Sequence, residues 1–271
     1  MFELLYILLA VIGAGAAGWN DLKTTDIPDW ITGGMIVVGL TLHGVESVLL
    51  GTADPLFYSF IVGAAFAIIG IIMYYSGMWG GGDGLLLTGI GVLLPDFSGY
   101  IGWMPFSLAY FINVLTIGAV YSIVYMFYVA LKNNDLRKKF LDGLKKNYLG
   151  LGGIILGVIF LGYSFSIGLN WFLIFGGILF FGMPIIYPLS KIVEGGFYRE
   201  IDTKNLEEGD MVGENIPELE IGKLKIRGIT KEEVKKIREL RKSIFIRDGI
   251  RYGPVFLLAL LFTLLMGFPS L

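Results

Sequence analysis

The chain has 271 residues, of which 55% are hydrophobic and only 16% charged, and its mean hydropathy is +0.72. A soluble domain of this length carries about a quarter charged residues, so this composition predicts an integral membrane protein. The net charge is −2. The absence of cysteine excludes cysteine proteases, thiolate zinc sites and disulfides, and the single histidine, His43, excludes multi-histidine metal sites.

Apolar runs dominate the chain from its beginning to its end. A helix that crosses a bilayer needs about 20 apolar residues, and the fourth and last runs are short enough to be half-spans or interfacial helices. We therefore predict an all-α polytopic membrane protein with six to eight transmembrane helices. The runs cover residues 2–19, 30–50, 56–75, 84–95, 105–131, 149–167, 170–189 and 253–269.

A polar segment, residues 190–252, separates the last two runs. It carries nearly equal numbers of basic and acidic residues, which is typical of a folded insert rather than a basic tail. Its first half predicts short strands, and its second half predicts a helix that opens with a capping box at Thr230 and Glu233. The apolar residues that follow at helical spacing are Val234, Ile237, Leu240 and Ile244.

The basic residues predict the orientation in the membrane. They gather after the first, fifth and seventh runs, and cytoplasmic loops of membrane proteins are enriched in Lys and Arg. We therefore expect these three loops, including the small α+β insert, on the cytoplasmic face of the cell membrane.

Two of the few acidic residues near the apolar runs are candidates for chemistry, because ionisable groups at membrane depth are costly and mark functional sites by default. Asp21 ends the first run, and Asp83 stands in a glycine-rich turn directly ahead of the fourth run. Runs two and three cross the membrane out and back, so both acids are expected at the cytoplasmic face. Each has a structural alternative: Asp21 as a solvated acid in a turn, and Asp83 as the N-cap of the next helix.

The combination of these two acids with the glycines favours a shared site. Glycines let backbone and substrate approach closely, and they allow a break in the helix where it lines a cavity. Two carboxylates within hydrogen-bond reach cannot both ionise easily, so the pair holds one proton near neutral pH. The ionised carboxylate then activates a water that attacks a peptide carbonyl, and the protonated one stabilises the oxyanion. This arrangement is typical of aspartic proteases.

The sequence resembles the archaeal type IV prepilin and preflagellin (prearchaellin) peptidases, a branch of the GxGD membrane aspartyl proteases. The resemblance covers residues 15–95. Bacterial members of the family add a cysteine-rich zinc loop, which this chain lacks, so the resemblance to the archaeal members implies no metal and no cofactor. The residues that carry it are Asp21, the stretch Asp26-Ile27-Pro28-Asp29, and Gly80-Gly81-Gly82-Asp83-Gly84.

The resemblance implies a membrane aspartyl endopeptidase that cleaves the positively charged leader peptide from prepilin or preflagellin precursors at the cytoplasmic membrane face, with Asp21 and Asp83 as the catalytic pair. The implied partners are precursors with class III (type IV pilin-like) leaders and membrane lipids, and no nucleic acid. Acids near Asp21 suit a basic leader, although they are also common in turns. The candidate substrate-binding residues are Asp26, Asp29, Gly80, Gly81, Gly82 and Gly84.

We accordingly divide the chain into a transmembrane catalytic domain (1–189), the cytoplasmic insert (190–252) and a C-terminal transmembrane or interfacial helix (253–271). His43 and Glu46, three residues apart on one helix face, are interpreted as a structural pair rather than as metal ligands.

Three alternative functions remain open. An intramembrane protease of the presenilin or signal-peptide-peptidase type expects a Tyr-Asp motif, and that dipeptide is absent from the sequence. A proton-coupled transporter also uses paired acids, but expects them near the bilayer midplane and often within inverted repeats. A lipid head-group transferase expects more basic and metal-binding residues beside the glycine turn.

Overall fold

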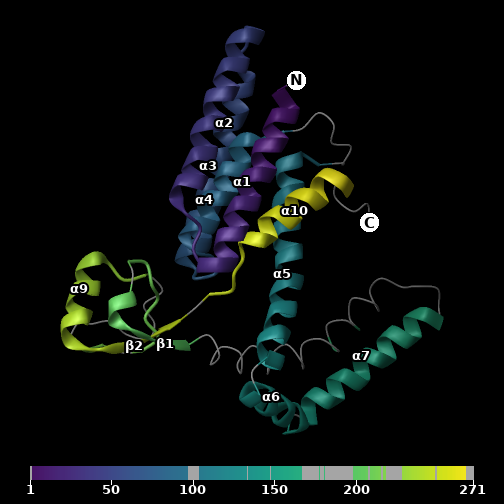
Figure 1. Cartoon of the computed structure of the whole chain (residues 1–271). Coiled ribbons are helices and arrows are strands. Elements are labelled where there is room, and N and C mark those ends of the chain that lie inside the picture. Colours follow the sequence, from purple (N-terminus) through teal and green to yellow (C-terminus); the bar gives the residue numbers. More distant parts are fainter. Residues whose placement is uncertain are drawn as a thin grey trace.

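The structure is a computed structural model that describes residues 2–96, 104–132, 134–146, 148–166, 177, 180, 198–206, 208–214, 216–217, 228–247 and 249–266. Helices with one small two-stranded sheet make up these residues, which confirms the predicted fold class (Figure 1). Within the described residues, four helices are long and apolar enough to cross a membrane, and each matches a predicted run. They are α1 (Phe2–Thr24), α2 (Asp29–Leu50), α3 (Asp54–Tyr75) and α5 (Phe106–Lys132).

The remaining apolar helices are shorter or lie apart from these four. At 1.5 Å per residue, α4 (Gly81–Leu93) is about 20 Å long, less than the hydrocarbon thickness of about 30 Å, so it is a half-span. α10 (Gly253–Met266) contacts α1 and α5. Figure 1 shows α6 (Asn134–Lys146) and α7 (Tyr148–Ser166) below the bundle, at the far end of α5. The predicted run 170–189 lies outside the described residues apart from two positions, so the count of six to eight crossings stays a prediction.

The half-span α4 is the most buried helix of the bundle, since α1, α2 and α3 all contact it. Glycines make the closest of these approaches. A Cβ added at Gly84 would lie 3.0 Å from the Cα of Gly70 in α3, and one added at Gly89 would lie 3.0 Å from the Cβ of Met35 in α2. Small residues at such contacts let helix backbones pack tightly where no water drives association. This packing holds the whole of α4, including its first turn, in one place.

Side chains from α2 and α3 complete the hydrogen bonding at the buried end of α4. The Ser59 hydroxyl donates to the Val92 carbonyl at 2.8 Å, and His43 Nε2 lies 3.3 Å from the Leu93 carbonyl. His43 Nδ1 lies 3.4 Å from a carboxylate oxygen of Glu46. These contacts satisfy carbonyls that a helix end leaves unpaired, and they confirm that His43 and Glu46 are a structural pair.

The insert contains β1 (Tyr198–Asp202), a 3₁₀ turn η2 (Thr203–Asn205), α9 (Lys231–Leu240) and β2 (Ser243–Arg247), with β1 and β2 antiparallel. The capping box is confirmed, because the Thr230 N–H donates to Glu233 Oε2 at 2.8 Å. The predicted helix is too long: α9 ends at Leu240 and Ile244 lies in β2. Ile244 and Ile246 are buried while Phe245 is 42% exposed, so the period of this stretch is that of a strand.

Candidate active site

Asp21 lies in the last turn of α1 and is only 6% exposed. Its Oδ2 accepts a hydrogen bond of 2.6 Å from the backbone N–H of Gly253, the first residue of α10. The alternative of a solvated acid in a turn is therefore wrong. A buried carboxylate at the end of an apolar helix needs such a donor, because leaving it unpaired costs a large desolvation penalty.

Asp83 is the third residue of α4, and its Oδ2 accepts a 2.9 Å hydrogen bond from the N–H of Gly80. Gly80 itself occupies the N-cap position, so the alternative in which Asp83 is the N-cap is wrong as well. Its side chain instead reaches back over the first turn, the geometry of the second half of a capping box. The carboxylate thereby lies at the positive end of the α4 dipole.

The structure brings the two aspartates to the same end of the bundle, where α1 ends and α4 begins (Figure 1). Asp83 lies close enough to Asp21 to interact with its charge. The two motifs also touch, because a Cβ added at Gly82 would lie 2.7 Å from the Cβ of Ile27. We refer to this end of the bundle as the aspartate end.

The four predicted substrate-binding glycines differ in their surroundings. Gly82 and Gly84 approach Ile27 and Gly70 too closely for any side chain, so they pack against the protein itself. Gly80 and Gly81 are exposed, and no atom comes within 3.4 Å of a Cβ added at either position. Only this pair leaves open space for another backbone, and binding of substrate by the glycines stays a prediction.

Asp26, on the connection between α1 and α2, and Asp29, the first residue of α2, are both exposed. Asp26 lies within electrostatic range of Asp21. Thr25, between Asp21 and Asp26, has a φ of +62°, a left-handed conformation that β-branched residues seldom adopt. This turn follows the end of α1 at Thr24 and leads into Pro28 and the first residue of α2. The two acids therefore stand in water beside the aspartate end, and their role in substrate binding stays a prediction.

The sequence did not single out the segment Arg251–Gly253, although it lies against Asp21. Arg251 donates to the carbonyl of Leu22, and its charge acts on Asp21. The only local signal is a Gly-Pro pair at the start of the last apolar run, which marks a helix start and says nothing of a partner.

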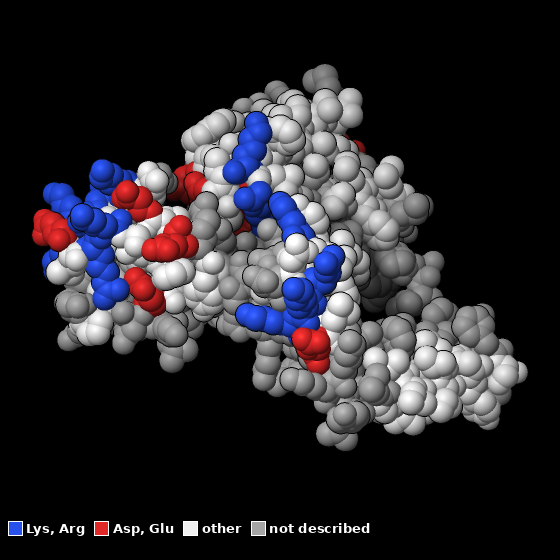
Figure 2. Space-filling view, turned by 60° about the horizontal axis from the view of Figure 1, so that its bottom comes forward, with Lys and Arg blue, Asp and Glu red and all other residues white. Residues whose placement is uncertain are grey.

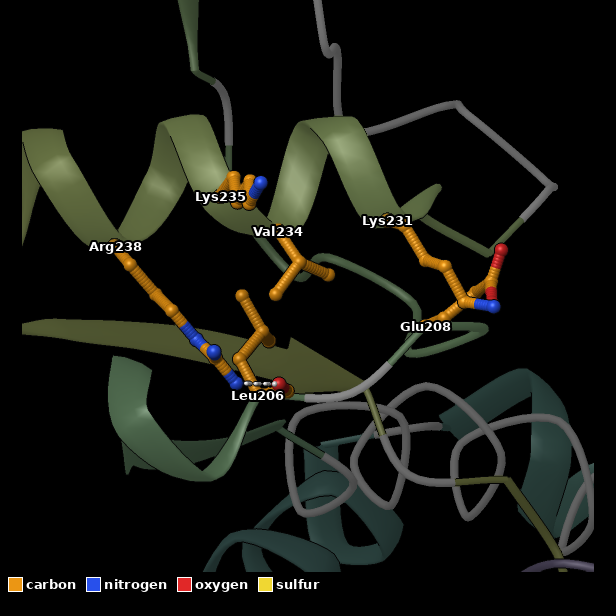
Figure 3. Close-up of a pocket in the computed structure, with 6 residues that line it drawn as sticks. All are labelled: Leu206, Glu208, Lys231, Val234, Lys235 and Arg238. Atoms are coloured by element: carbon orange, nitrogen blue, oxygen red, sulfur yellow. Dashed lines mark hydrogen bonds and ion pairs between the residues drawn. The ribbon is translucent and has the colours of Figure 1, made fainter.

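The insert presents a pocket of about 380 Å³ between α9 and the segment before it (Figure 3). Two of its cations contact protein acceptors: Arg238 donates to the Leu206 carbonyl at 2.9 Å, and Lys231 lies 3.4 Å from Glu208. These contacts hold the small domain together. Among the residues that the structure describes, no group of three or more His, Cys, Asp or Glu side chains is placed to hold a metal ion.

Residues 7–127 match the sequence profile of the type IV leader peptidase family. The chain is 31% identical over 144 residues to a preflagellin peptidase of Methanococcus voltae, covering 48% of this chain and 60% of that protein. It is 25% identical over 159 residues to the prepilin peptidase EppA of Methanothermobacter thermautotrophicus, covering 54% and 41%. A preflagellin peptidase of Methanocaldococcus jannaschii is 30% identical over 91 residues, covering 34% and 38%.

Each match therefore spans less than two thirds of the relative's own length. The matched part of this chain includes most of α1, all of α2 to α4, the two aspartates and the glycine turn. Residues 7–127 of this chain are thus similar to the type IV leader peptidase family.

Proposed function

We propose that this protein is a membrane aspartyl endopeptidase that removes the basic leader peptide from prepilin or preflagellin precursors. The observation that carries the proposal is the placement of Asp21 and Asp83, from separate helices, at one end of the bundle in a chain that matches the leader peptidase family. In this proposal, residues 1–189 form the catalytic domain and residues 190–252 form a cytoplasmic insert.

The proposed reaction uses the two carboxylates as a pair that shares one proton. The ionised carboxylate takes a proton from a water molecule, and the water oxygen attacks the carbonyl carbon of the scissile peptide bond. The protonated carboxyl donates a hydrogen bond to the oxyanion that forms. The C–N bond then breaks, and the leaving amine takes a proton from the pair. The roles belong to the pair, because interacting carboxyls titrate together.

We propose that the aspartate end faces the cytoplasm. Lys23 lies in the last turn of α1, Lys132 ends α5 and Arg251 precedes α10. Figure 2 shows a row of Lys and Arg side chains across the lower face of the molecule as drawn in Figure 1, with few acidic ones outside the insert. Basic residues of this kind are enriched on the cytoplasmic side of membrane proteins. A precursor whose leader is still in the cytoplasm would meet the carboxylates there.

The proposed function is tested by incubating the purified full chain, in detergent or lipid, with a preflagellin and with a prepilin precursor. Mass spectrometry of the products locates the cut. We expect a single cleavage between the basic leader and the apolar helix of one or both precursors. An intact precursor under conditions in which the protein remains folded would refute the proposal.

We predict that the exposed acids beside Asp21 bind the basic leader. In Asp26→Asn or Asp29→Asn, KM for a leader with Lys and Arg should rise about 1.4- to fivefold with little change in kcat, because a solvent-exposed ion pair contributes about 0.2–1 kcal/mol. The measurement is steady-state cleavage of two precursors that differ only in whether the leader is basic or has Gln in place of Lys and Arg.

The two substrates make this prediction specific. The neutral leader should be cleaved by wild type and by both variants with the same KM. Asp54→Asn, at the opposite end of α3 from the aspartate end, is the matched control and should behave as wild type with both leaders. Equal KM values of wild type and variants for the basic leader would remove these acids from substrate recognition.

A further inference from the structure

The segment Arg251–Gly253, which ends on the first residue of α10, touches the end of α1 at two points. The N–H of Gly253 donates to Asp21 Oδ2 at 2.6 Å, and the Arg251 guanidinium donates to the carbonyl of Leu22. Arg251 is also within electrostatic range of the Asp21 carboxylate. One backbone donor and one cation thus converge on the acid from a part of the chain far away in sequence.

Tyr252, between these two residues, anchors the segment to another helix. Its ring occupies the space over Gly118 of α5, where an added Cβ would overlap the Tyr252 hydroxyl, and that hydroxyl donates to the Val114 carbonyl at 3.2 Å. On its other side the ring lies 5.9 Å from the ring of Trp79, the residue before Gly80. The segment therefore contacts α1, α5 and the turn that leads to Asp83.

The close contact between the start of α10 and the end of α1 leaves no room for a side chain at position 253. An added Cβ there would lie 2.9 Å from the Cβ of Asp21 and 3.0 Å from its Oδ2. Across the same contact, a Cβ added at Gly18 would lie 3.2 Å from the backbone of Pro254. The hydrogen bond from Gly253 needs this approach, since a side chain at either glycine would push α10 away from α1.

We propose that Arg251–Gly253 is a positioning segment that fixes the Asp21 carboxylate for catalysis. Gly253 holds one carboxylate oxygen through its N–H, Arg251 stabilises the negative charge, and Tyr252 keeps the segment against the bundle. The inference rests on the proposed peptidase function. It also links the insert to the site, because β2 ends at Arg247 and the chain reaches Gly253 a few residues later.

The first test measures cleavage by Arg251→Gln and Arg251→Lys. In Arg251→Gln, kcat should fall about 10- to 100-fold while KM stays within twofold of wild type, because a misplaced or less stable carboxylate affects the chemical step rather than substrate binding. Arg251→Lys keeps the charge and should recover most of kcat. Arg137→Gln removes an exposed cation from α6 and is the matched control, with wild-type kcat expected.

The second test needs no cleavage. The unfolding temperatures of wild type, Arg251→Gln, Asp21→Asn and the double variant form a double-mutant cycle. Arg251→Gln should lower the unfolding temperature by about 2 °C or more in wild type and by less in the Asp21→Asn background, because the charge it acts on is then gone.

The two tests separate this inference from the proposed function. Additive effects in the cycle, or a wild-type kcat in Arg251→Gln, would overturn the positioning role. A coupled cycle in a protein that cleaves neither precursor would refute the peptidase function and leave the contact between Arg251 and Asp21 supported.

Discussion

Asp21→Asn and Asp83→Asn should each reduce precursor cleavage by at least about a thousandfold without unfolding the protein. The loss is large because the one carboxyl that remains cannot be the general base and the proton donor at the same time, and residues that act as a pair lose most of their effect when either is removed. The fold should persist, because the amide oxygen of asparagine can still accept from Gly253 at position 21 or from Gly80 at position 83. Mass spectrometry measures residual cleavage, and circular dichroism with thermal unfolding measures the fold.

Asp54→Asn is the matched control for this pair. Asp54 begins α3, at the end of that helix away from Gly70 and Asp83, and its Oδ2 accepts from Thr52 Oγ1 at 2.7 Å. The variant makes the same chemical change, and cleavage should stay at the wild-type rate. Near wild-type cleavage by either Asp21→Asn or Asp83→Asn would show that the two aspartates are not the catalytic pair.

Gly84→Val should destabilise the protein by about 3 kcal/mol or more and abolish cleavage. The added Cβ would meet the Gly70 backbone at 3.0 Å, and backbone cannot rotate away as a flexible side chain can. Overpacking a tight contact costs about 1–3 kcal/mol, and here the helices themselves must separate. Because Asp83 directly precedes Gly84, a shifted α4 would also displace the carboxylate. Thermal unfolding in detergent and the cleavage assay measure the two effects.

Gly34→Ala is the control for the change at Gly84. Gly34 lies within α2, and nothing comes within 4 Å of a Cβ added there. Alanine should leave stability unchanged or raise it by up to about 1 kcal/mol, because glycine is the poorer helix former. Equal stability of Gly84→Val and wild type would mean that the contact between α3 and α4 is looser than the structure has it.

Local sequence patterns predicted some features of the insert and missed others. The capping box at Thr230 was predictable because both of its partners lie within one turn. The end of α9 was not, since Ile244 fits a helical spacing and a strand spacing equally well. Ile244 lies in a strand because β2 pairs with β1, which lies more than 40 residues earlier in the chain. Tertiary contacts of this kind override a weak local preference.

The amino-acid sequence by itself determined the membrane class, the four long helices and the two acids, because apolar length and a charge at the end of an apolar run are local properties. Only the tertiary structure decided that the short helix α4 is buried among the other helices and that Asp21 is held by an N–H 232 positions away in the chain. Such contacts depend on how helices pack in three dimensions. A glycine whose added Cβ would lie 3 Å from another backbone looks the same in the sequence as one that faces open space.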